Sequence, residues 1–408
     1  NVMVAPKPLS HTKPLLLLLL FVVCSSEMVL SMVTTSSPTK THHVVVLVHG
    51  LWGNEKELGY LEQAMETEAS RKLSSSSDTL QIYSSKCNVG RTQDGVAAGG
   101  KRLADEIQDV MKSVVTSNDN DSNRHDSETP AITLSFVGNS LGGLYARYAL
   151  VQLFEEQPRP FQPLFFCTTA TPHLGVTKHT YLWIPRWMEW VVGKGMQQTG
   201  EDLLGLNELV REMGTSQKYL SPLRSFRNRI AMANAYQTDF QVPLGTAAML
   251  GSGSDEDVGE DGVLHYPIED DESVILKNNP LVVFHSRTKA VDVSSDESSC
   301  ANSMVEGLNN LGWTKILVDV RSAMIRLVPR SGRAASLGPL PTCSQLLRAF
   351  SSLPFTSLPF GHSVMVANSK SEAYSRMNAK GRPIMDDLAK LLIKYLHQHE
   401  QEVANVAG

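Results

Sequence analysis

The chain alternates between short apolar runs and longer amphipathic stretches. The apolar runs predict buried strands at 44–48, 131–137, 230–233 and 316–320. Helical patterning is found at 144–150 and at 385–400. Because strands are separated by helical segments, the pattern predicts a doubly wound, mostly parallel sheet of the α/β class.

One strand-to-helix junction carries candidate chemistry. Residues 138–142 read Gly-Asn-Ser-Leu-Gly and fit the pattern G-x-S-x-G between the strand at 131–137 and the helix at 144–150. In this pattern a strained turn lifts a serine hydroxyl above the sheet, and side chains at the two glycine positions would collide with it. Ser140 is therefore the candidate nucleophile. The alternative is a glycine-rich turn with an incidental serine.

An earlier loop is suited to stabilising negative charge. The strand at 44–48 is followed by His49-Gly50-Leu51-Trp52-Gly53. Acyl transfer places negative charge on the carbonyl oxygen, which backbone N–H groups can stabilise. We expect one N–H from Leu141, directly after the nucleophile, and the other from Leu51, with Trp52 beside the substrate. We interpret His49 as a residue that shapes the loop, because in this chain order the base follows the serine.

Several ordered motifs cover residues 44–249 and suggest a family. Residues 88–95 fit N-x-x-x-T-x-D-G, residues 100–104 fit G-x-R-L-A, and 169–175 read TATPHLG. With 223–236, these motifs resemble the lipase-like serine esterase family of α/β-hydrolases, which includes the ROG-type lipases of fungi and plants. The resemblance implies an α/β-hydrolase fold with a helical cap insertion. It also implies a Ser-Asp-His triad that cleaves carboxylic esters of lipids, of acylglycerol or lysophospholipid type, through an acyl-serine intermediate without a cofactor.

The acidic member of the triad is expected after the serine. Asp239 follows the strand at 230–233, at the edge where open α/β sheets collect their chemistry, and it lies in the D-x-x-V-P pattern of the family. An aspartate that only caps a turn is the alternative interpretation. Asp94 and Asp202 rank lower, because they precede the relevant strand or lie in the predicted cap.

Five histidines follow Asp239 and are candidates for the base: His265, His285, His362, His397 and His399. His362 lies between the last predicted strand and the C-terminal helix, in the loop expected to carry the base. His285 ends an apolar run and is the second choice. In the predicted mechanism His362 takes the proton of Ser140, and Asp239 orients the imidazole.

Three tryptophans mark the predicted cap at 176–225. Trp183, Trp187 and Trp190 are spaced by four and three residues, so they share one face if the segment is helical. We expect them to line an acyl groove or to contact a lipid surface. Packing of the cap onto the core explains the spacing almost equally well.

Composition excludes some other classes. The 408 residues are 42% hydrophobic, enough for one large domain, and the net charge of -5 gives no indication of nucleic-acid binding. The five cysteines show no C-x-x-C spacing and no metal-binding pattern, and Cys167 is expected in a buried strand. A Cys300–Cys343 bridge is conceivable, and an acidic loop insert is expected at 251–279.

The N-terminal segment predicts targeting. Basic residues precede an apolar run at 15–24 and small residues follow it, which is typical of a secretory signal peptide. We expect a leader at 1–33, a linker at 34–41 and the hydrolase domain at 42–408. An uncleaved membrane anchor and an organelle address stay open.

Two other functions stay open on the same residues. An acyltransferase or thioesterase could use the same triad. An inactive hydrolase fold could bind lipid or protein, although a binding module would not need all of Ser140, Asp239 and His362. The expected partner is a lipid or other acyl ester, with membrane-surface association as an option and the oligomeric state undetermined.

Overall fold

The computed structural model describes residues 41–73, 78–119, 131–155, 159–176, 197–236, 238–239, 241–250, 265–266, 271–291, 303–322 and 361–407. The predicted leader and most of the linker lie outside the described residues. So do Trp183, Trp187, Trp190, Cys300 and Cys343. The predicted domain boundaries stay predictions. The structure contains no helix, among the residues described, that is long and apolar enough to cross a membrane.

The centre of the fold is a sheet of eight strands in the order β2-β1-β3-β4-β5-β8-β7-β6. Its strands are β1 (Thr41–Val48), β2 (Thr79–Ser84), β3 (Ala131–Asn139), β4 (Gln162–Thr169), β5 (Asn228–Asn234), β6 (His265–Tyr266), β7 (Val282–Thr288) and β8 (Thr314–Val318). The first five strands and β8 run parallel to one another, whereas β7 pairs with β8 and with β6 in antiparallel register.

The strand order changes direction at β1. The chain leaves β1 for β2 on one side and then returns to form β3 on the other. In open α/β sheets, ligands bind outside the carboxyl ends of the strands at such a switch point. The loop after β1 and the turn after β3 therefore meet at the position where this architecture supports a site.

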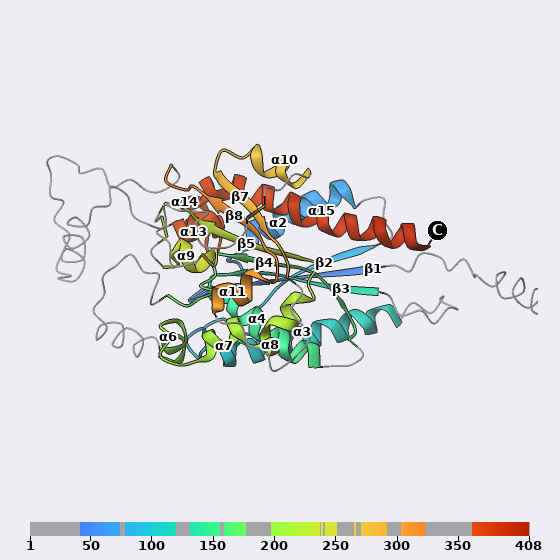
Figure 1. Ribbon diagram of the computed structural model, residues 1–408. Coiled ribbons are helices and arrows are strands. Elements are labelled where there is room, and N and C mark those ends of the chain that lie inside the picture. The colour runs from blue at the N-terminus through green and yellow to red at the C-terminus, as the bar shows by residue number, and fades with distance from the viewer. Residues whose placement is uncertain are drawn as a thin grey trace, which may run out of the picture. The chain divides into compact units, whose positions relative to one another are not determined.

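Helices cover both faces of the sheet, as Figure 1 shows. One face carries α2 (Gly59–Lys72), α9 (Leu244–Ala247), α10 (Asp271–Lys277), α13 (Gly361–Met365), α14 (Glu372–Met377), the short 3-10 helix η1 (Ala379–Gly381) and α15 (Arg382–Ala407). The other carries α3 (Val96–Asp119), α4 (Leu141–Glu155), α6 (Gln197–Leu203), α7 (Leu209–Thr215), α8 (Gln217–Arg224) and α11 (Met304–Asn309). This confirms the doubly wound, mostly parallel α/β fold. Helices α6 to α8 form the helical insertion between β4 and β5.

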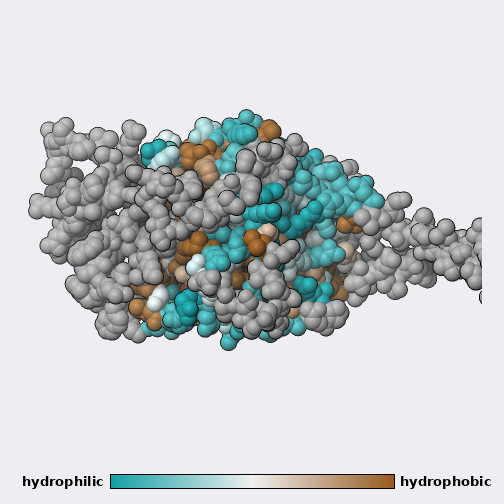
Figure 2. Space-filling view, in the orientation of Figure 1, coloured by the Kyte–Doolittle hydropathy of each residue, from teal (hydrophilic) through white to brown (hydrophobic). Residues whose placement is uncertain are grey.

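The central strands β1, β3, β4, β5 and β8 are largely buried on both faces, which explains their mostly apolar sequences. In β1, Val45 and Leu47 join the core beneath α2 and α15, whereas Val44 and Val46 join the core beneath α3 and α4. Cys167 is fully buried in β4 as a free thiol, as expected. The coloured part of the surface in Figure 2 is mostly hydrophilic, and its hydrophobic residues form separate patches.

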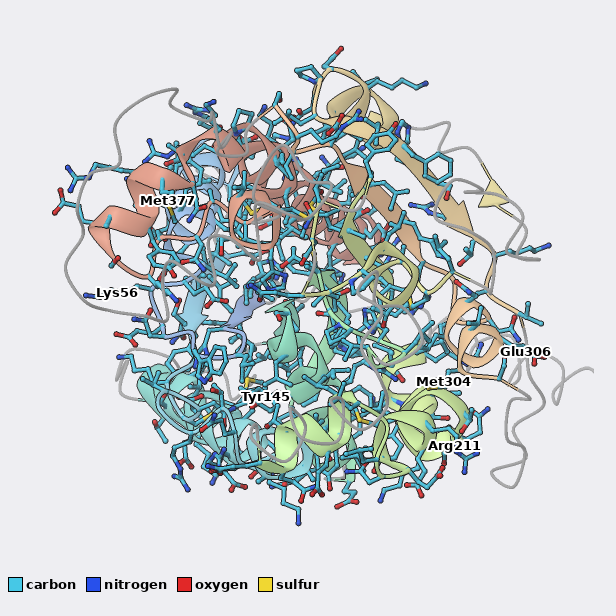
Figure 3. All side chains as sticks on the ribbon, turned by 90° about the vertical axis from the view of Figure 1, so that its left-hand side faces the viewer. Lys56, Tyr145, Arg211, Met304, Glu306 and Met377 are labelled. Carbon is cyan, nitrogen blue, oxygen red and sulfur yellow. The ribbon has the colours of Figure 1, made fainter. Side chains whose placement is uncertain are left out.

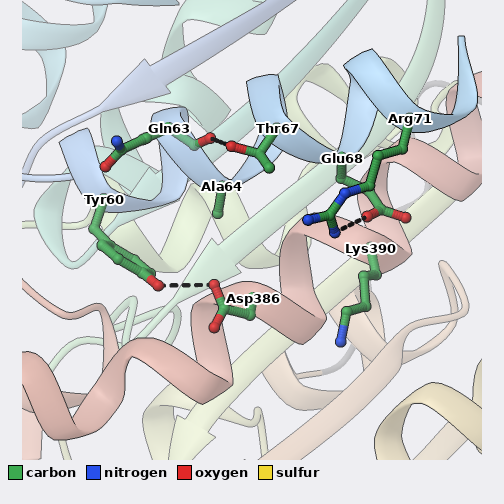
Figure 4. A pocket seen from close by; sticks show the side chains of 8 residues that line it. All are labelled: Tyr60, Gln63, Ala64, Thr67, Glu68, Arg71, Asp386 and Lys390. Atoms are coloured by element: carbon green, nitrogen blue, oxygen red, sulfur yellow. Dashed lines mark hydrogen bonds and ion pairs between the residues drawn. The ribbon is translucent and has the colours of Figure 1, made fainter. Parts of the chain in front are cut away.

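Helices α2 and α15 enclose a surface groove (Figure 4). Its polar side chains contact one another: the Tyr60 hydroxyl donates to Asp386 at 2.9 Å, and Arg71 lies 3.5 Å from Glu68. Burial, followed by the hydrogen bond to Asp386, raises the pKa of Tyr60 to about 12. The polar side chains that line the groove are therefore engaged with one another, and the bond between Tyr60 and Asp386 links α2 to α15.

Two segments differ from the expected loops. The described part of the insert at 251–279 includes β6 and α10, because the antiparallel edge of the sheet extends into it. His362 lies in the helix α13 rather than in an irregular loop. All three elements are too short for their periodicity to be recognised in sequence.

Candidate active site

Ser140 lies between the last residue of β3 and the first residue of α4. Its φ of 54° is in the left-handed region, which non-glycine residues rarely adopt. Three hydrogen bonds hold the strained residue: its N–H donates to Thr169 at 2.8 Å, and its carbonyl accepts from Gly143 N–H and the Thr171 hydroxyl. Figure 3 looks onto this end of the sheet, where the parallel strands finish.

Close backbone contacts explain the glycines around the serine. A Cβ at Gly142 would lie 2.3 Å from the Val48 carbonyl oxygen, so only glycine lets the turn approach the end of β1. A Cβ at Gly50 would lie 2.8 Å from the Cβ of Ser140. The loop after β1 is therefore in direct contact with the turn that bears the serine.

Asp239 lies beyond β5, fully buried, with both carboxylate oxygens engaged. Its Oδ1 accepts from the N–H groups of Gln241 and Val242, each at 2.9 Å. Its Oδ2 accepts from the Asn234 amide at 3.1 Å and lies 2.8 Å from His362 Nδ1. These bonds fix the carboxylate in one orientation toward the imidazole.

His362 is brought to Asp239 by α13, across 123 positions of sequence. The Gly361 N–H donates to the Thr238 carbonyl at 2.9 Å, which joins the two segments directly beside the pair. Burial lowers the pKa of His362, but the charge and hydrogen bond of Asp239, together with the charge of Glu57, outweigh it, so the pKa is raised. A neutral imidazole here is a stronger base than an exposed histidine.

The second choice for the base lies elsewhere. His285 is inside β7, opposite Ile316 of β8, rather than at a strand end. Burial and the charge of Lys277 lower its pKa, and no carboxylate contributes to that shift. His49 is buried, and its Nδ1 lies 3.0 Å from the neighbouring carbonyl of Gly50.

The loop after β1 presents one exposed aromatic side chain. Trp52 is 64% exposed and has a φ of 54°, and its N–H donates to the Thr92 hydroxyl at 3.1 Å. Leu51 precedes it and is half-buried, whereas Leu141 opens α4 and is fully buried. The two expected oxyanion donors, the N–H groups of Leu51 and Leu141, therefore lie in different segments. These segments meet where Gly50 lies against Ser140.

Glu57 is a buried carboxylate that the sequence did not single out. Its Oε1 accepts from Gly50 N–H at 2.9 Å and from the Asn139 amide at 2.6 Å. Asn139 in turn accepts from the Thr169 hydroxyl at 2.9 Å. Glu57 thus connects the loop after β1 to the residue before Ser140. Asn139 stands at a variable position of G-x-S-x-G, and Glu57 has no local pattern that would reveal it.

The two other aspartates hold loops together. Asp202, fully buried in α6, accepts from the N–H of Val96 at 2.6 Å, at the start of α3. Asp94 pairs with Arg102 at 2.8 Å. Neither makes a described contact with His362.

Comparison with known proteins identifies the family. The sequence model described as "Putative serine esterase (DUF676)" matches residues 38–252, more than half of the chain. The chain belongs to this family. The description of this family agrees with the class of enzyme expected from the motifs. The doubly wound α/β sheet with a helical insertion agrees with the architecture that the resemblance implied.

Two yeast relatives match at about a third identity. "Putative lipase ROG1" of Saccharomyces cerevisiae is 33% identical over 224 residues, which are 52% of this chain and 29% of the relative. "Putative lipase C4A8.10" of Schizosaccharomyces pombe is 30% identical over 286 residues, 65% of this chain and 34% of the relative. The chain spans about a third of the length of these curated relatives.

Solved structures overlap with the chain to a limited extent. Phospholipase PlaB from Legionella pneumophila gives a TM-score of 0.30 at 14% identity, covering 52% of this chain and 42% of that one. An extracellular α/β-hydrolase from a Paenibacillus species gives a TM-score of 0.27 at 12% identity, covering 50% of this chain and 81% of that one.

Proposed function

We propose that the protein is a serine hydrolase that cleaves carboxylic esters of lipids through an acyl-serine intermediate. The observation that carries the proposal is the buried contact of 2.8 Å between His362 and Asp239, at the same end of the sheet as the strained Ser140. A hydroxyl becomes an effective nucleophile when an oriented base can accept its proton.

In the proposed reaction, the Ser140 oxygen attacks the ester carbonyl while His362 Nε2 takes the hydroxyl proton. Asp239 accepts from Nδ1–H and stabilises the imidazolium. The amides of Leu51 and Leu141 donate to the oxyanion, in line with the contact between their segments. His362 then protonates the departing alcohol, and water, activated by the same imidazole, releases the acid and restores Ser140.

Covalent labelling with a fluorophosphonate tests this proposal, because only an activated serine reacts. The unaltered chain should be labelled and should hydrolyse a short p-nitrophenyl ester. Ser140→Ala should lose both properties, whereas Ser135→Ala, in the buried interior of β3, should keep them. Labelling of Ser140→Ala at another residue would refute the assignment, and an unlabelled, folded parent chain would indicate an inactive binding module.

The lipid part of the proposal is supported by the exposed Trp52, in the loop whose Gly50 lies against Ser140, and by the names of the yeast relatives. Trp52→Ala should lower kcat/KM for long-chain esters about tenfold or more while sparing a short soluble ester, since a buried aromatic contact is worth on the order of 2 kcal/mol. The side chain is exposed, so the melting temperature should not change. Equal losses on both substrates would contradict a lipid contact.

A further inference from the structure

A second cluster of polar side chains lies at the other end of the sheet, where β1 and β2 begin. His43 of β1, Asp78 before β2 and Glu400 of α15 each offer one ligand atom, and these atoms all lie within 4.8 Å of one another. The three residues come from segments far apart in the sequence. This arrangement is remote from Ser140, which follows the opposite end of β3.

Two of these atoms are buried without a hydrogen-bond partner. His43 is fully buried, and neither its Nε2 nor Oε1 of Glu400 has a hydrogen-bond partner among the residues the structure describes. The two atoms lie 3.5 Å apart. A buried polar atom without a partner is costly, and an unmodelled ion is one of the recognised explanations.

The remaining contacts hold the ligand atoms in place. Nδ1 of His43 lies 2.7 Å from the Thr133 hydroxyl, which leaves the Nε2 lone pair for a ligand when Nδ1 carries the proton. Asp78 accepts from the Thr41 N–H at 2.7 Å. Histidines that bind metals usually hydrogen-bond through their other ring nitrogen in this way, and ligating carboxylates are likewise held.

The spacing fits a metal that takes nitrogen and oxygen together. Ligands at about 2.1 Å in tetrahedral geometry are roughly 3.4 Å apart, close to the 3.5 Å between His43 and Glu400. The half-buried Asp78 lies within 4.8 Å of the other two ligand atoms, and a side-chain rotation can bring its carboxylate closer. An imidazole with two carboxylates suits Zn²⁺ and similar transition metals better than Mg²⁺ or Ca²⁺.

We propose that His43, Asp78 and Glu400 bind a divalent transition-metal ion that joins the beginnings of β1 and β2 to α15. The ion is bound at the end of the sheet opposite the candidate active site. Its role is to stabilise the fold by cross-linking the first strand, the edge strand and the last helix, since a ligand that binds only the native state raises its stability.

Zinc titration of the full chain, stripped of metal with a chelator, tests the proposal. Calorimetry should give a site of about one Zn²⁺ per chain, and Zn²⁺ should raise the melting temperature by several degrees while equimolar Mg²⁺ should not. His43→Gln and Glu400→Gln should each lose this equivalent of zinc and the thermal shift. His285→Gln, a half-buried histidine in β7, is the matched control and should keep both.

Two outcomes would overturn the proposal. If the unaltered chain shows no thermal response to Zn²⁺, or if both variants retain the same zinc stoichiometry and shift, the three residues do not form a metal site. If Glu400→Gln lowers the melting temperature of the metal-free protein and zinc has no effect, the contact is an ordinary histidine–glutamate ion pair. Fluorophosphonate labelling of each variant confirms that it has folded.

Discussion

At the scale of single residues, the contact between Asp239 and His362 makes His362 the proposed base. His362→Ala should reduce kcat by about four orders of magnitude or more, because Ser140 then has no proton acceptor. Asp239→Asn should cost about 10⁴-fold, since the amide favours the wrong tautomer. His285→Ala should retain most activity. Steady-state kinetics on a short ester checks the ranking, and a greater loss in His285→Ala would reverse the assignment.

The charges around His362 predict how the activity depends on pH. In the proposed mechanism the neutral imidazole of His362 is the active form. Because the pKa of His362 is raised, kcat/KM should begin to fall with acid, on the acid limb of its pH profile, at a pH above the ordinary histidine value of about 6.5. Glu57→Gln removes one of the negative charges that raise this pKa, so the limb should move to lower pH.

Glu62 provides a matched control for the Glu57 variant. Glu62 of α2 accepts from the Ser84 hydroxyl instead, so Glu62→Gln should leave the limb in place. Glu57→Gln should also reduce kcat more than it raises KM, because Oε1 fixes Gly50 and Asn139 beside the reacting groups. A limb that stays in place or moves to higher pH would contradict this coupling.

Some of these residues could be predicted from sequence and others could not. Ser140 and Asp239 stand in short patterns directly after apolar strands, so local sequence is sufficient to select them as candidates. For His362 the sequence offers only its order in the chain, between the last predicted strand and the C-terminal helix. Glu57 and the cluster around His43 depend on contacts between distant segments, and no spacing within the sequence records such contacts.

At the scale of elements, a buried arginine connects α4 to the helical insertion. Arg147 is fully buried and donates to the carbonyl oxygens of His173 and, from its other terminal nitrogen, Met213 of α7. Burial lowers the pKa of the guanidinium to about 9, and burial followed by the charge of Arg147 lowers the pKa of His173. The two carbonyl oxygens that accept from the guanidinium offset part of the cost of burying its charge.

Arg147→Ala should destabilise the fold by about 2–5 kcal/mol, because it leaves buried carbonyls without donors and opens a cavity. Urea unfolding measures the change. Arg159→Ala is the control, since Arg159 is exposed and lies over the ring of Phe154, and it should cost under about 1 kcal/mol. An unchanged midpoint for Arg147→Ala would show that the insertion does not depend on this contact.

Strand positions were predicted well and their ends less well. The predicted strand at 131–137 is observed as Ala131–Asn139, and that at 230–233 as Asn228–Asn234. The apolar run marks only the part of a strand that is covered by helices, whereas ladder hydrogen bonds continue into polar residues. The helix expected at 385–400 spans Arg382–Ala407 in the structure.

At the scale of the whole molecule, α15 completes one of the two cores. Leu388, Leu392 and Leu396 are buried together with Leu61 and Met65 of α2. A chain ending at Gly381 should therefore bind a hydrophobic dye and lose fluorophosphonate labelling, while one ending after Glu402 should fold. Proper folding of the shorter chain would show that α15 is dispensable.

The closing of this core by the last helix also matters while the protein is being made. Helix α2 emerges from the ribosome roughly 310 residues before α15, which at about 5–20 residues per second means a wait of about 15–60 s. Throughout that time Leu58, Leu61 and Met65 lack the helix that later buries them. Nascent chains should thus require a chaperone that shields apolar segments, and soluble yield should rise when such a chaperone is supplied in excess.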